Sequence, residues 1–380
     1  MGSLEMDGLE IEGGIPLHGD IYVSGAKNAA LPLLATGLMC DGTLTLTHVP
    51  DLADTRLMIE LLAHHGLDIG FQDGRVSMSG PATNMDAPYD LVSKMRASIL
   101  VLGPLLARYG EARVSLPGGC AIGTRPVDLH IRAMQKLGAT VELADGYIQA
   151  RAPKGLTGNK IVFPFVSVGA TENAMMAAAC ASGTSQIVNA AREPEIIDLA
   201  DCLNAMGARI TGQGTDTLTI EGVASLSTAT HRVVADRVEA GTFIMAAAMT
   251  GGSLTVRDII PHHLDVLFDV MRQTGVGIDI GDNFVTVSAN GRYQAQNVET
   301  QPYPGFPTDL QAQFTAMMCL AEGVSQISET IFENRFMHVP ELVRMGADIS
   351  VDGRTAIIRG KDALLPAPVM ATDLRASVSL

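Results

Sequence analysis

The chain has 380 residues, of which 47% are hydrophobic and 18% charged, and its 41 acidic and 26 basic side chains give a formal net charge of -15. This composition excludes a disordered chain, and the acidic balance argues against nucleic acid or an anionic membrane as a partner, since both require a basic surface. The length predicts two or three domains, each with a full hydrophobic core.

The start of the chain and its cysteines indicate the compartment. Residues 1–15 carry acidic side chains and lack the basic and apolar segments of a secretory signal. Uncharged runs such as residues 240–256 are too short and too rich in Gly, Thr and Ser to span a bilayer. An odd number of cysteines without a CxxC pair suits a reducing compartment. We therefore expect a cytoplasmic enzyme, with Cys40, Cys180 and Cys319 in apolar core positions.

A structural unit repeats about every 70 residues along the chain. Five helical patterns end in a glycine that fits the left-handed position after a helix, namely Gly66, Gly138, Gly207, Gly275 and Gly346. Two strands with a tight turn follow each glycine, as in residues 140–143 and 147–150. The sequence therefore predicts one supersecondary unit used several times.

Each unit also contains a second helix that is apolar nearly all round, which predicts burial. Such helices are expected at residues 28–40, 173–181, 238–249 and 310–321, each followed by a strand that begins with glycine. Three units sharing inner helices would close one domain, and six would make two. Residues 372–380 resemble the opening of a sixth inner helix, so we expect the chain to be truncated, with about forty residues missing.

Cys120 lies in a glycine-rich stretch that we interpret as a movable lid. Gly118, Gly119 and Gly123 loosen the backbone around it, and Arg125 follows just before a predicted helix start. A nearby guanidinium would favour the thiolate and attract an anionic substrate. The alternative is a surface turn with an incidental cysteine, because most free cysteines behave as small apolar residues.

The repeated units, the segment of residues 24–32 (SGAKNAALP) and the PGGC sequence at 117–120 together resemble the enolpyruvyl transferases, over residues 9–380. The resemblance implies an α/β fold, a two-domain inverted α/β barrel (α/β prism) of six βαβαββ-like units, with the sixth truncated here. It implies a discontinuous domain I of residues 1–26 and 235–380, and a domain II of residues 27–234 that carries the Cys120 lid loop. The substrates would bind between the two domains.

The resemblance is strongest to family members that use a nucleotide sugar, and it implies a reaction. The enolpyruvyl group of phosphoenolpyruvate would pass to the 3-hydroxyl of UDP-N-acetylglucosamine with release of phosphate, as the first committed step of peptidoglycan precursor synthesis. Cys120 matches the proton donor to C3, which can form a covalent adduct and is alkylated by fosfomycin. No metal, cofactor, nucleic acid or membrane partner is implied.

Further residues match the family's binding and catalytic positions. The cations that bind phosphoenolpyruvate would be Lys27, Arg96 and Arg125 from one domain and Arg335 and Arg375 from the other. The carboxylates for proton transfer would be Asp309 and Asp373, and which of them is the general base stays open. Lys27 is also assigned to the catalytic set.

The nucleotide sugar would contact five separate parts of the chain. Residues Arg125, Pro126, Val127, Asp128 and Leu129 would hold the uracil end, largely through backbone groups. Ser167, Val168 and Gly169 would approach the diphosphate with amides at a helix start. Phe165 stands where other members can place a lysine, so one charged contact is in doubt. Asn28, Asp309 and Ile331 match sugar-contacting positions.

Simpler interpretations and rival functions stand beside these. Arg96 alone would be a solvated helix charge, Asp309 a helix-start acid, and the pairs His64-His65 and His262-His263 solvated surface residues. The rival 5-enolpyruvylshikimate-3-phosphate synthase shares the fold but lacks the lid cysteine. A UDP-sugar-binding protein without turnover is the second rival, if the last unit is truly absent.

Overall fold

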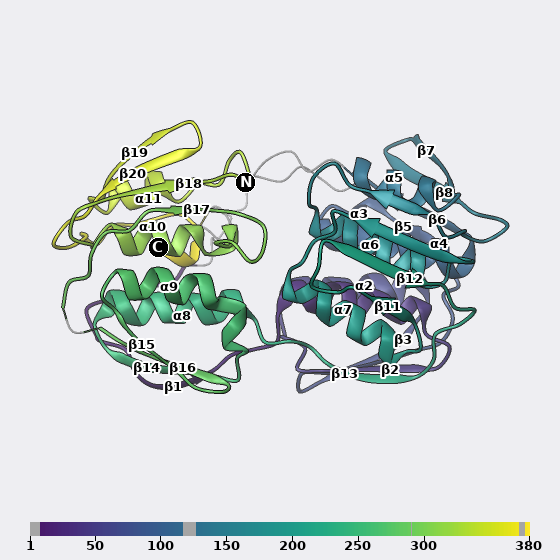
Figure 1. The fold of residues 1–380 in the computed structure, drawn as a ribbon, viewed down its shortest axis with the longest axis horizontal. Coiled ribbons are helices and arrows are strands. Elements are labelled where there is room, and N and C mark those ends of the chain that lie inside the picture. Colours follow the sequence, from purple (N-terminus) through teal and green to yellow (C-terminus); the bar gives the residue numbers. More distant parts are fainter. Residues whose placement is uncertain (1–7, 117–126, 290, 372–376) are drawn as a thin grey trace, which may run out of the picture.

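The computed structural model describes residues 8–116, 127–289, 291–371 and 377–380. Within these ranges the chain forms five four-stranded sheets with helices packed on them (Figure 1). In each sheet the first strand is parallel to the second, and the remaining strands are antiparallel to their neighbours. The predicted repeat is therefore confirmed as a repeat of one sheet topology.

Three of the sheets are built from one continuous stretch of chain each. They are β5(Asp86–Ala87)-β6(Glu111–Ser115)-β8(Tyr147–Arg151)-β7(Thr140–Ala144), β9(Lys160–Val162)-β10(Thr184–Val188)-β12(Thr217–Glu221)-β11(Arg209–Thr211) and β17(Val298–Glu299)-β18(Val324–Ser328)-β20(Thr355–Arg359)-β19(Asp348–Asp352). Period-two alternation puts the apolar face of each sheet against the helices.

Each of the other two sheets contains one strand that is distant in sequence from its other three strands. They are β1(His18–Tyr22)-β14(Ser253–Arg257)-β16(Phe284–Ser288)-β15(Gly277–Ile280) and β13(Ala229–Arg232)-β2(Thr43–Thr47)-β4(Arg75–Ser79)-β3(Asp68–Gln72). The chain crosses between these two sheets twice, at residues 23–26 and 233–236. These two crossing segments pair with each other, because Ala26 N donates to Val234 O (2.7 Å) and Asp236 N donates to Ser24 O (2.9 Å). The His48 ring lies between them, within 3.1 Å of Val233 O and 3.2 Å of Val23 O.

The helices divide into buried and outer ones. The buried ones, with at least half of their residues buried, include α1 (Lys27–Ala35), α6 (Val168–Ala179), α7 (Pro194–Ala205), α8 (Arg237–Thr250) and α10 (Gln311–Met318). The outer ones include α2 (Ala53–His65), α5 (Asp128–Lys136), α9 (Asp265–Gln273) and α11 (Val339–Arg344). Every residue of α10 and all from Ala170 to Ala179 of α6 are buried, which confirms the predicted inner helices.

The remaining helices are short. They are α3 (Tyr89–Val92), α4 (Leu102–Tyr109) and the 3₁₀ turns η1 (Thr36–Met39), η2 (Arg96–Val101), η3 (Pro261–Leu264), η4 (Thr308–Leu310) and η5 (Ser377–Ser379). The five predicted helix-ending glycines adopt φ values of 111° (Gly66), 95° (Gly138), 106° (Gly207), 90° (Gly275) and 90° (Gly346). These left-handed values confirm the repeat at the level of the backbone.

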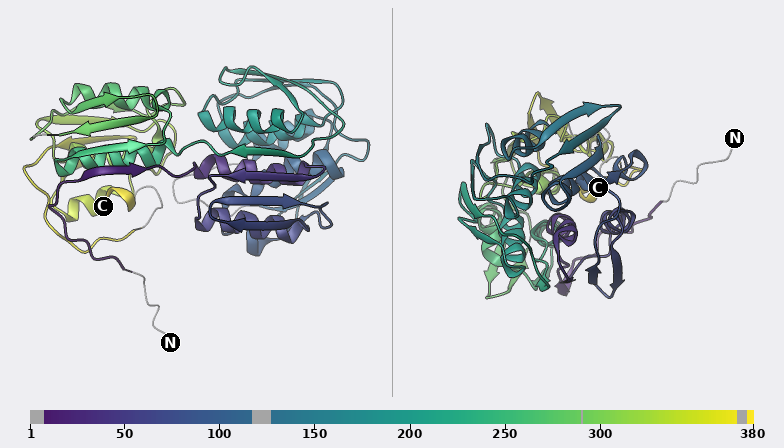
Figure 2. Two further views of the ribbon diagram at one scale, coloured as in Figure 1. Left: turned by 90° about the horizontal axis from the view of Figure 1, so that it is seen from below. Right: turned by 90° about the vertical axis from the view of Figure 1, so that its right-hand side faces the viewer.

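Two separate hydrophobic cores give the molecule two lobes, seen side by side in Figure 2. The first lobe has core residues from Ala26 to Val233, and the second has Val23 and residues from Val238 to Ile358. The predicted domain boundaries and the predicted truncation of a sixth unit stay predictions. None of the helices in the described ranges is long and apolar enough to cross a membrane.

Candidate active site

Lys27 and Asn28 form the first turn of α1, directly after the crossing segment of the chain. Lys27 Nζ lies 2.8 Å from Asp54 Oδ2 on α2, and the Lys27 backbone N–H donates to Asp236 Oδ2 at 3.2 Å. The ammonium is thus held in place by a carboxylate of its own lobe. An anionic substrate at this position would either share the Lys27 ammonium with the Asp54 carboxylate or replace Asp54 as its partner.

The Asp309 carboxylate accepts hydrogen bonds from residues of both lobes. It lies in η4, so it is a first-turn acid before α10, as the simpler interpretation expected. Arg335 Nη2 donates to Asp309 Oδ1 at 2.7 Å, and Asn28 Nδ2 donates to Asp309 Oδ2 at 3.4 Å. The Arg335 side chain is 4% exposed and that of Asp309 23%. Three predicted site residues from distant parts of the sequence therefore meet at one partly exposed carboxylate.

Glu329 organises the loop that carries Ile331, and sequence reasoning missed it. The carboxylate is buried and accepts four hydrogen bonds: from Thr300 Oγ1 (2.9 Å), Thr308 Oγ1 (2.9 Å), Ile331 N (2.8 Å) and Phe332 N (3.1 Å). It thereby joins the Ile331 loop to the residue preceding Asp309. The only feature of the sequence that points to Glu329 is its position as an acidic residue directly after a strand in which apolar and polar residues alternate.

In the first lobe, the starts of α5 and α6 lie together. Leu129 is buried in the first turn of α5, whereas Asp128 is exposed. Ser167 caps α6, its Oγ accepting the Ala170 N–H at 3.4 Å. A Cβ built on Gly169 would lie 3.4 Å from Cε1 of His130 on α5, so the two helix starts are in direct contact.

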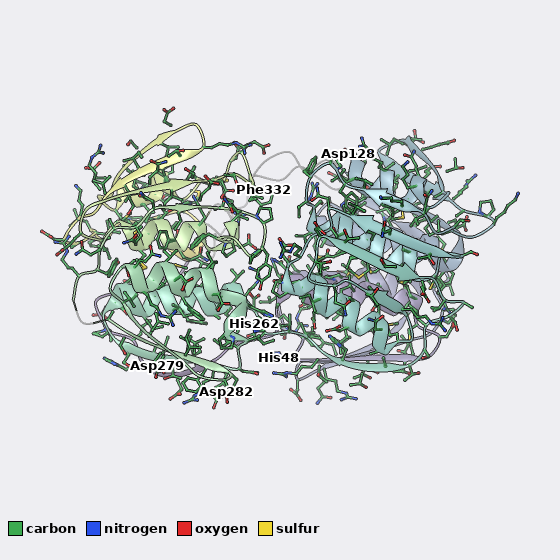
Figure 3. The ribbon with its side chains drawn as sticks, viewed as in Figure 1. His48, Asp128, His262, Asp279, Asp282 and Phe332 are labelled. Atoms are coloured by element: carbon green, nitrogen blue, oxygen red, sulfur yellow. The ribbon has the colours of Figure 1, made fainter. Side chains whose placement is uncertain are left out.

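Arg96 joins this cluster from η2. Arg96 is half-buried. The burial of His130, together with the Arg96 charge, lowers the pKa of the His130 imidazole to about 4. Asp128 of the first lobe and Phe332 of the second lie on the sides of the lobes that face each other (Figure 3). The residues expected at the uracil and the diphosphate, Asp128, Leu129 and Ser167 to Gly169, thus lie at two adjoining helix starts of the first lobe. Phe165, four residues before Gly169, is exposed.

Five predicted site residues lie outside the described residues. These are Cys120, Arg125 and Pro126 of the expected lid, and Asp373 and Arg375 near the end of the chain. Their roles stay predictions.

A buried ion pair, also missed from the sequence, joins the lobes. Arg237 at the start of α8 donates from Nε and Nη2 to Glu195 Oε1 and Oε2 of α7, at 3.1 and 3.3 Å. Beside it, Glu193 Oε1 accepts the Tyr303 N–H at 3.3 Å. Burial, with the nearby Glu195 and Glu193 charges, raises the pKa of Glu172 to about 8. This cluster fixes the contact between α7 and α8 at the crossing.

Asp236 is a further missed residue at the same junction. Its Oδ1 accepts the Val238 and Glu239 amides at 2.8 and 3.1 Å, so it caps α8. Its Oδ2 receives the Lys27 amide, and the cap of a second-lobe helix therefore also positions the start of α1.

The histidine interpretation was wrong in part. His65 is fully buried with Nδ1 2.7 Å from Asn84 O, and burial lowers its pKa. His263 is half-buried, and burial lowers its pKa to about 4. His64 and His262 are exposed, as expected. The described residues contain no group of three His, Cys, Asp or Glu side chains arranged to hold a metal ion.

The expected core cysteines are two buried residues, Cys40 and Cys319, and a half-buried one, Cys180. Burial raises the pKa of all three thiols, to about 11 for Cys180 and about 12 for Cys319, which keeps them protonated. They therefore behave as core residues.

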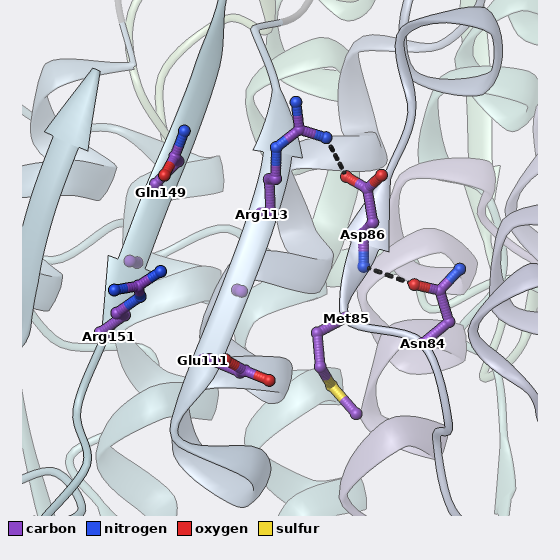
Figure 4. Close-up of a pocket in the computed structure, with 9 residues that line it drawn as sticks. Asn84, Met85, Asp86, Glu111, Arg113, Gln149 and Arg151 are labelled. Carbon is purple, nitrogen blue, oxygen red and sulfur yellow. Dashed lines mark hydrogen bonds and ion pairs between the residues drawn. The ribbon is translucent and has the colours of Figure 1, made fainter. Parts of the chain in front are cut away.

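The open pocket in Figure 4 lies elsewhere, on the sheet of β5, β6 and β8. Arg113 Nη1 and Asp86 Oδ1 form an ion pair of 2.8 Å across it. No predicted site residue lines this pocket.

The solved structures to which this chain is similar include an enolpyruvyl transferase. The enolpyruvyl transferase NikO from Streptomyces tendae matches with a TM-score of 0.86 and 25% identity, over 97% of this chain and 88% of that one. An EPSP synthase from Acinetobacter baumannii matches with a TM-score of 0.70 at 18% identity, over 97% of this chain and 89% of that one. The second likeness concerns the fold alone, and the predicted fold class is confirmed.

The family model described as EPSP synthase (3-phosphoshikimate 1-carboxyvinyltransferase) matches residues 11–380, and the chain belongs to this family. Proteins named UDP-N-acetylglucosamine 1-carboxyvinyltransferase from Gluconacetobacter diazotrophicus and Acidiphilium cryptum are 56% and 57% identical to it, over 99% of this chain and 90% of their own length. The chain is therefore a transferase of carboxyvinyl groups.

Proposed function

We propose that the protein transfers the enolpyruvyl group of phosphoenolpyruvate to the 3-hydroxyl of UDP-N-acetylglucosamine, releasing phosphate, as the first committed step of peptidoglycan precursor synthesis. The observation that carries the proposal is the 56–57% identity to relatives named for this transfer, over 99% of the chain. A cytoplasmic location is part of the proposal, because the nucleotide sugar and phosphoenolpyruvate are both metabolites of that compartment.

The chemistry is an addition followed by an elimination. The sugar oxygen forms a bond to C2 of phosphoenolpyruvate while C3 gains a proton and the hydroxyl loses one. C3 then loses a proton as the bond from C2 to the phosphate oxygen breaks. In the proposal Cys120 gives the proton to C3, and Asp309 or Asp373 accepts the hydroxyl proton.

The contacts of Asp309 support a place beside the acceptor sugar. Its carboxylate is 23% exposed and already accepts donors from Asn28 of one lobe and Arg335 of the other. A hydroxyl arriving there would find an oxygen acceptor whose position is fixed on both sides.

The proposal assigns the two lobes to the two predicted domains, with both substrates between them. Lys27, Arg96 and Arg335, with Arg125 and Arg375, bind the phosphate and carboxylate of phosphoenolpyruvate. Because these cations come from both lobes, binding of the anion favours their approach. Val127 to Leu129 hold the uracil end, and Ser167 to Gly169 approach the diphosphate with their amides.

Neither rival is favoured. The likeness to EPSP synthase is one of fold at 18% identity, and this chain has a cysteine at the lid position. A binding protein without turnover is not favoured either, because the relatives that match 99% of this chain are named for the transfer.

The test is phosphate release from phosphoenolpyruvate with UDP-N-acetylglucosamine or shikimate 3-phosphate as acceptor. We expect release only with the nucleotide sugar, and loss of release after fosfomycin with a mass increase on Cys120. Cys120→Asp should retain an acid and escape labelling. Release with shikimate 3-phosphate, or binding of the nucleotide sugar without release, would select one of the rivals.

A further inference from the structure

The buried Asn173 side chain has an orientation that the backbone determines. Its Oδ1 accepts the Gly103 N–H at 2.6 Å, and its Nδ2 donates to Ile99 O at 2.9 Å. A backbone N–H can only donate and a carbonyl can only accept, so the amide oxygen and nitrogen cannot be exchanged. The second hydrogen of Nδ2 points to His130 Nδ1, 3.0 Å away.

This contact selects the tautomer of His130. Because Asn173 donates, His130 Nδ1 must be the acceptor, and the ring proton of the neutral imidazole is on Nε2. Burial and the neighbouring Arg96 charge lower the pKa of His130 to about 4, so the ring is neutral at physiological pH. Nε2 is then a hydrogen-bond donor without a charge.

The donor lies against the start of α6. His130 is 8% exposed, and a Cβ on Gly169 would be 3.6 Å from Nε2. Among the described residues no acceptor receives the Nε2 proton. The twelve-residue helix α6 opens here with Val168 and Gly169, while Ser167 Oγ and O already accept the Ala170 and Thr171 amides. The Val168 and Gly169 amides and Nε2–H are therefore neighbouring donors with no described acceptor of their own.

We propose that His130 donates its Nε2 proton to a diphosphate oxygen of the nucleotide-sugar substrate, beside the Val168 and Gly169 amides, with Asn173 as the positioning residue that selects the tautomer. The inference rests on the proposed function and adds a residue to its binding site. The opposite tautomer would direct a nitrogen lone pair at the anion and repel it. Phe165 supplies no charge near this helix start, so neutral donors must carry more of the diphosphate recognition.

Two substitutions of His130 separate this role from a structural one. In His130→Gln the side-chain amide reaches the position of Nε2, whereas in His130→Asn it reaches only that of Nδ1 and keeps the contact with Asn173. We expect the Asn variant to weaken binding of UDP-N-acetylglucosamine about tenfold, a typical loss for one hydrogen bond to a charged group. The Gln variant should bind within about threefold of the parent protein.

Calorimetric titration with UDP-N-acetylglucosamine measures binding, and thermal unfolding controls for folding. Steady-state kinetics should show a raised KM for the nucleotide sugar in the Asn variant, without a rise in the KM for phosphoenolpyruvate. Equal affinities of all three proteins, or a loss in both variants that follows their thermal stability, would overturn the role of His130 and leave the proposed function standing. A parent protein that does not bind UDP-N-acetylglucosamine would overturn both.

Nitrogen-15 NMR of the histidine rings tests the tautomer directly. We expect His130 to show a protonated Nε2 and an unprotonated Nδ1 in the free protein, with the Nε2 resonance shifted on addition of UDP. A protonated Nδ1, or an Nε2 resonance that UDP leaves unchanged, would contradict the inference.

Discussion

The starts of α6 and α10 occupy the same place in two repeats of one unit, yet they carry different chemistry. At α6 the chain presents a small cap, Ser167, and the amides of Val168 and Gly169. At α10 a 3₁₀ turn presents Asp309, paired with Arg335 and braced through Thr308 by Glu329. The repeat supplies one scaffold, and in the proposed function the residues at the helix starts give it two roles, anion binding at α6 and proton transfer at α10.

The largest effect is expected at the α10 start. Asp309→Asn keeps an acceptor for Arg335 but removes the base strength of the carboxylate, and we expect kcat to fall about 10²- to 10⁴-fold. Phosphate release measures it. Asp282→Asn, on an exposed turn beyond β15, is the matched control and should leave the rate unchanged. A kcat for Asp309→Asn within a few-fold of the parent rate would remove Asp309 from the proton-transfer step.

Next in size is the buried pair that joins the lobes at the start of α8. Glu195→Ala leaves Arg237 buried without its bidentate partner, and we expect a loss of about 3 kcal/mol in the free energy of unfolding. Urea denaturation measures the loss. Glu221→Ala breaks the exposed pair with Arg209 and should cost far less. Equal losses in the two variants would show that the buried Arg237 pair contributes no more to the free energy of unfolding than the exposed pair does.

Glu172, in the middle of α6, gives a pH-dependent effect. Its folded-state pKa of about 8 lies above the ordinary glutamate value of 4.5, so the folded protein holds a proton that the unfolded chain releases. The stability from this group is complete below pH 4.5 and is lost as the pH rises toward 8. We expect urea midpoints of the parent protein to fall over this range more than those of Glu172→Gln. Parallel midpoint curves would contradict the raised pKa.

The smallest effect is expected just before α6. Phe165→Lys places a cation on an exposed position near the Gly169 amide, and we expect UDP-N-acetylglucosamine to bind about two- to fivefold more tightly at low salt. Raising the salt concentration should remove the gain. Calorimetry at two ionic strengths measures both. Unchanged affinity at low salt would place the diphosphate away from residue 165.

The repeat could be predicted from the sequence because it rests on local rules. Glycines such as Gly207 and Gly275 are needed where a helix ends in a left-handed conformation, and that pattern recurs visibly. The resemblance to a family supplied Lys27, Asn28, Asp309 and Arg335, and three of these meet at one carboxylate.

What could not be predicted depends on contacts between distant residues. Asp236 accepts the Lys27 amide, and Glu195 accepts the Arg237 side chain, only because the chain crosses twice between the lobes. The interpretation of His65 as a surface residue was wrong, because its spacing of four from the buried Leu61 places it on the inner face of α2.

The central claim is tested most directly by the product formed from phosphoenolpyruvate and UDP-N-acetylglucosamine. Carbon-13 NMR with phosphoenolpyruvate labelled at C2 and C3 should show the enolpyruvyl carbons attached through the 3-oxygen of the sugar, with one phosphate released per product. Enolpyruvyl carbons on another acceptor, or phosphate release with no labelled carbon on the nucleotide sugar, would contradict the account.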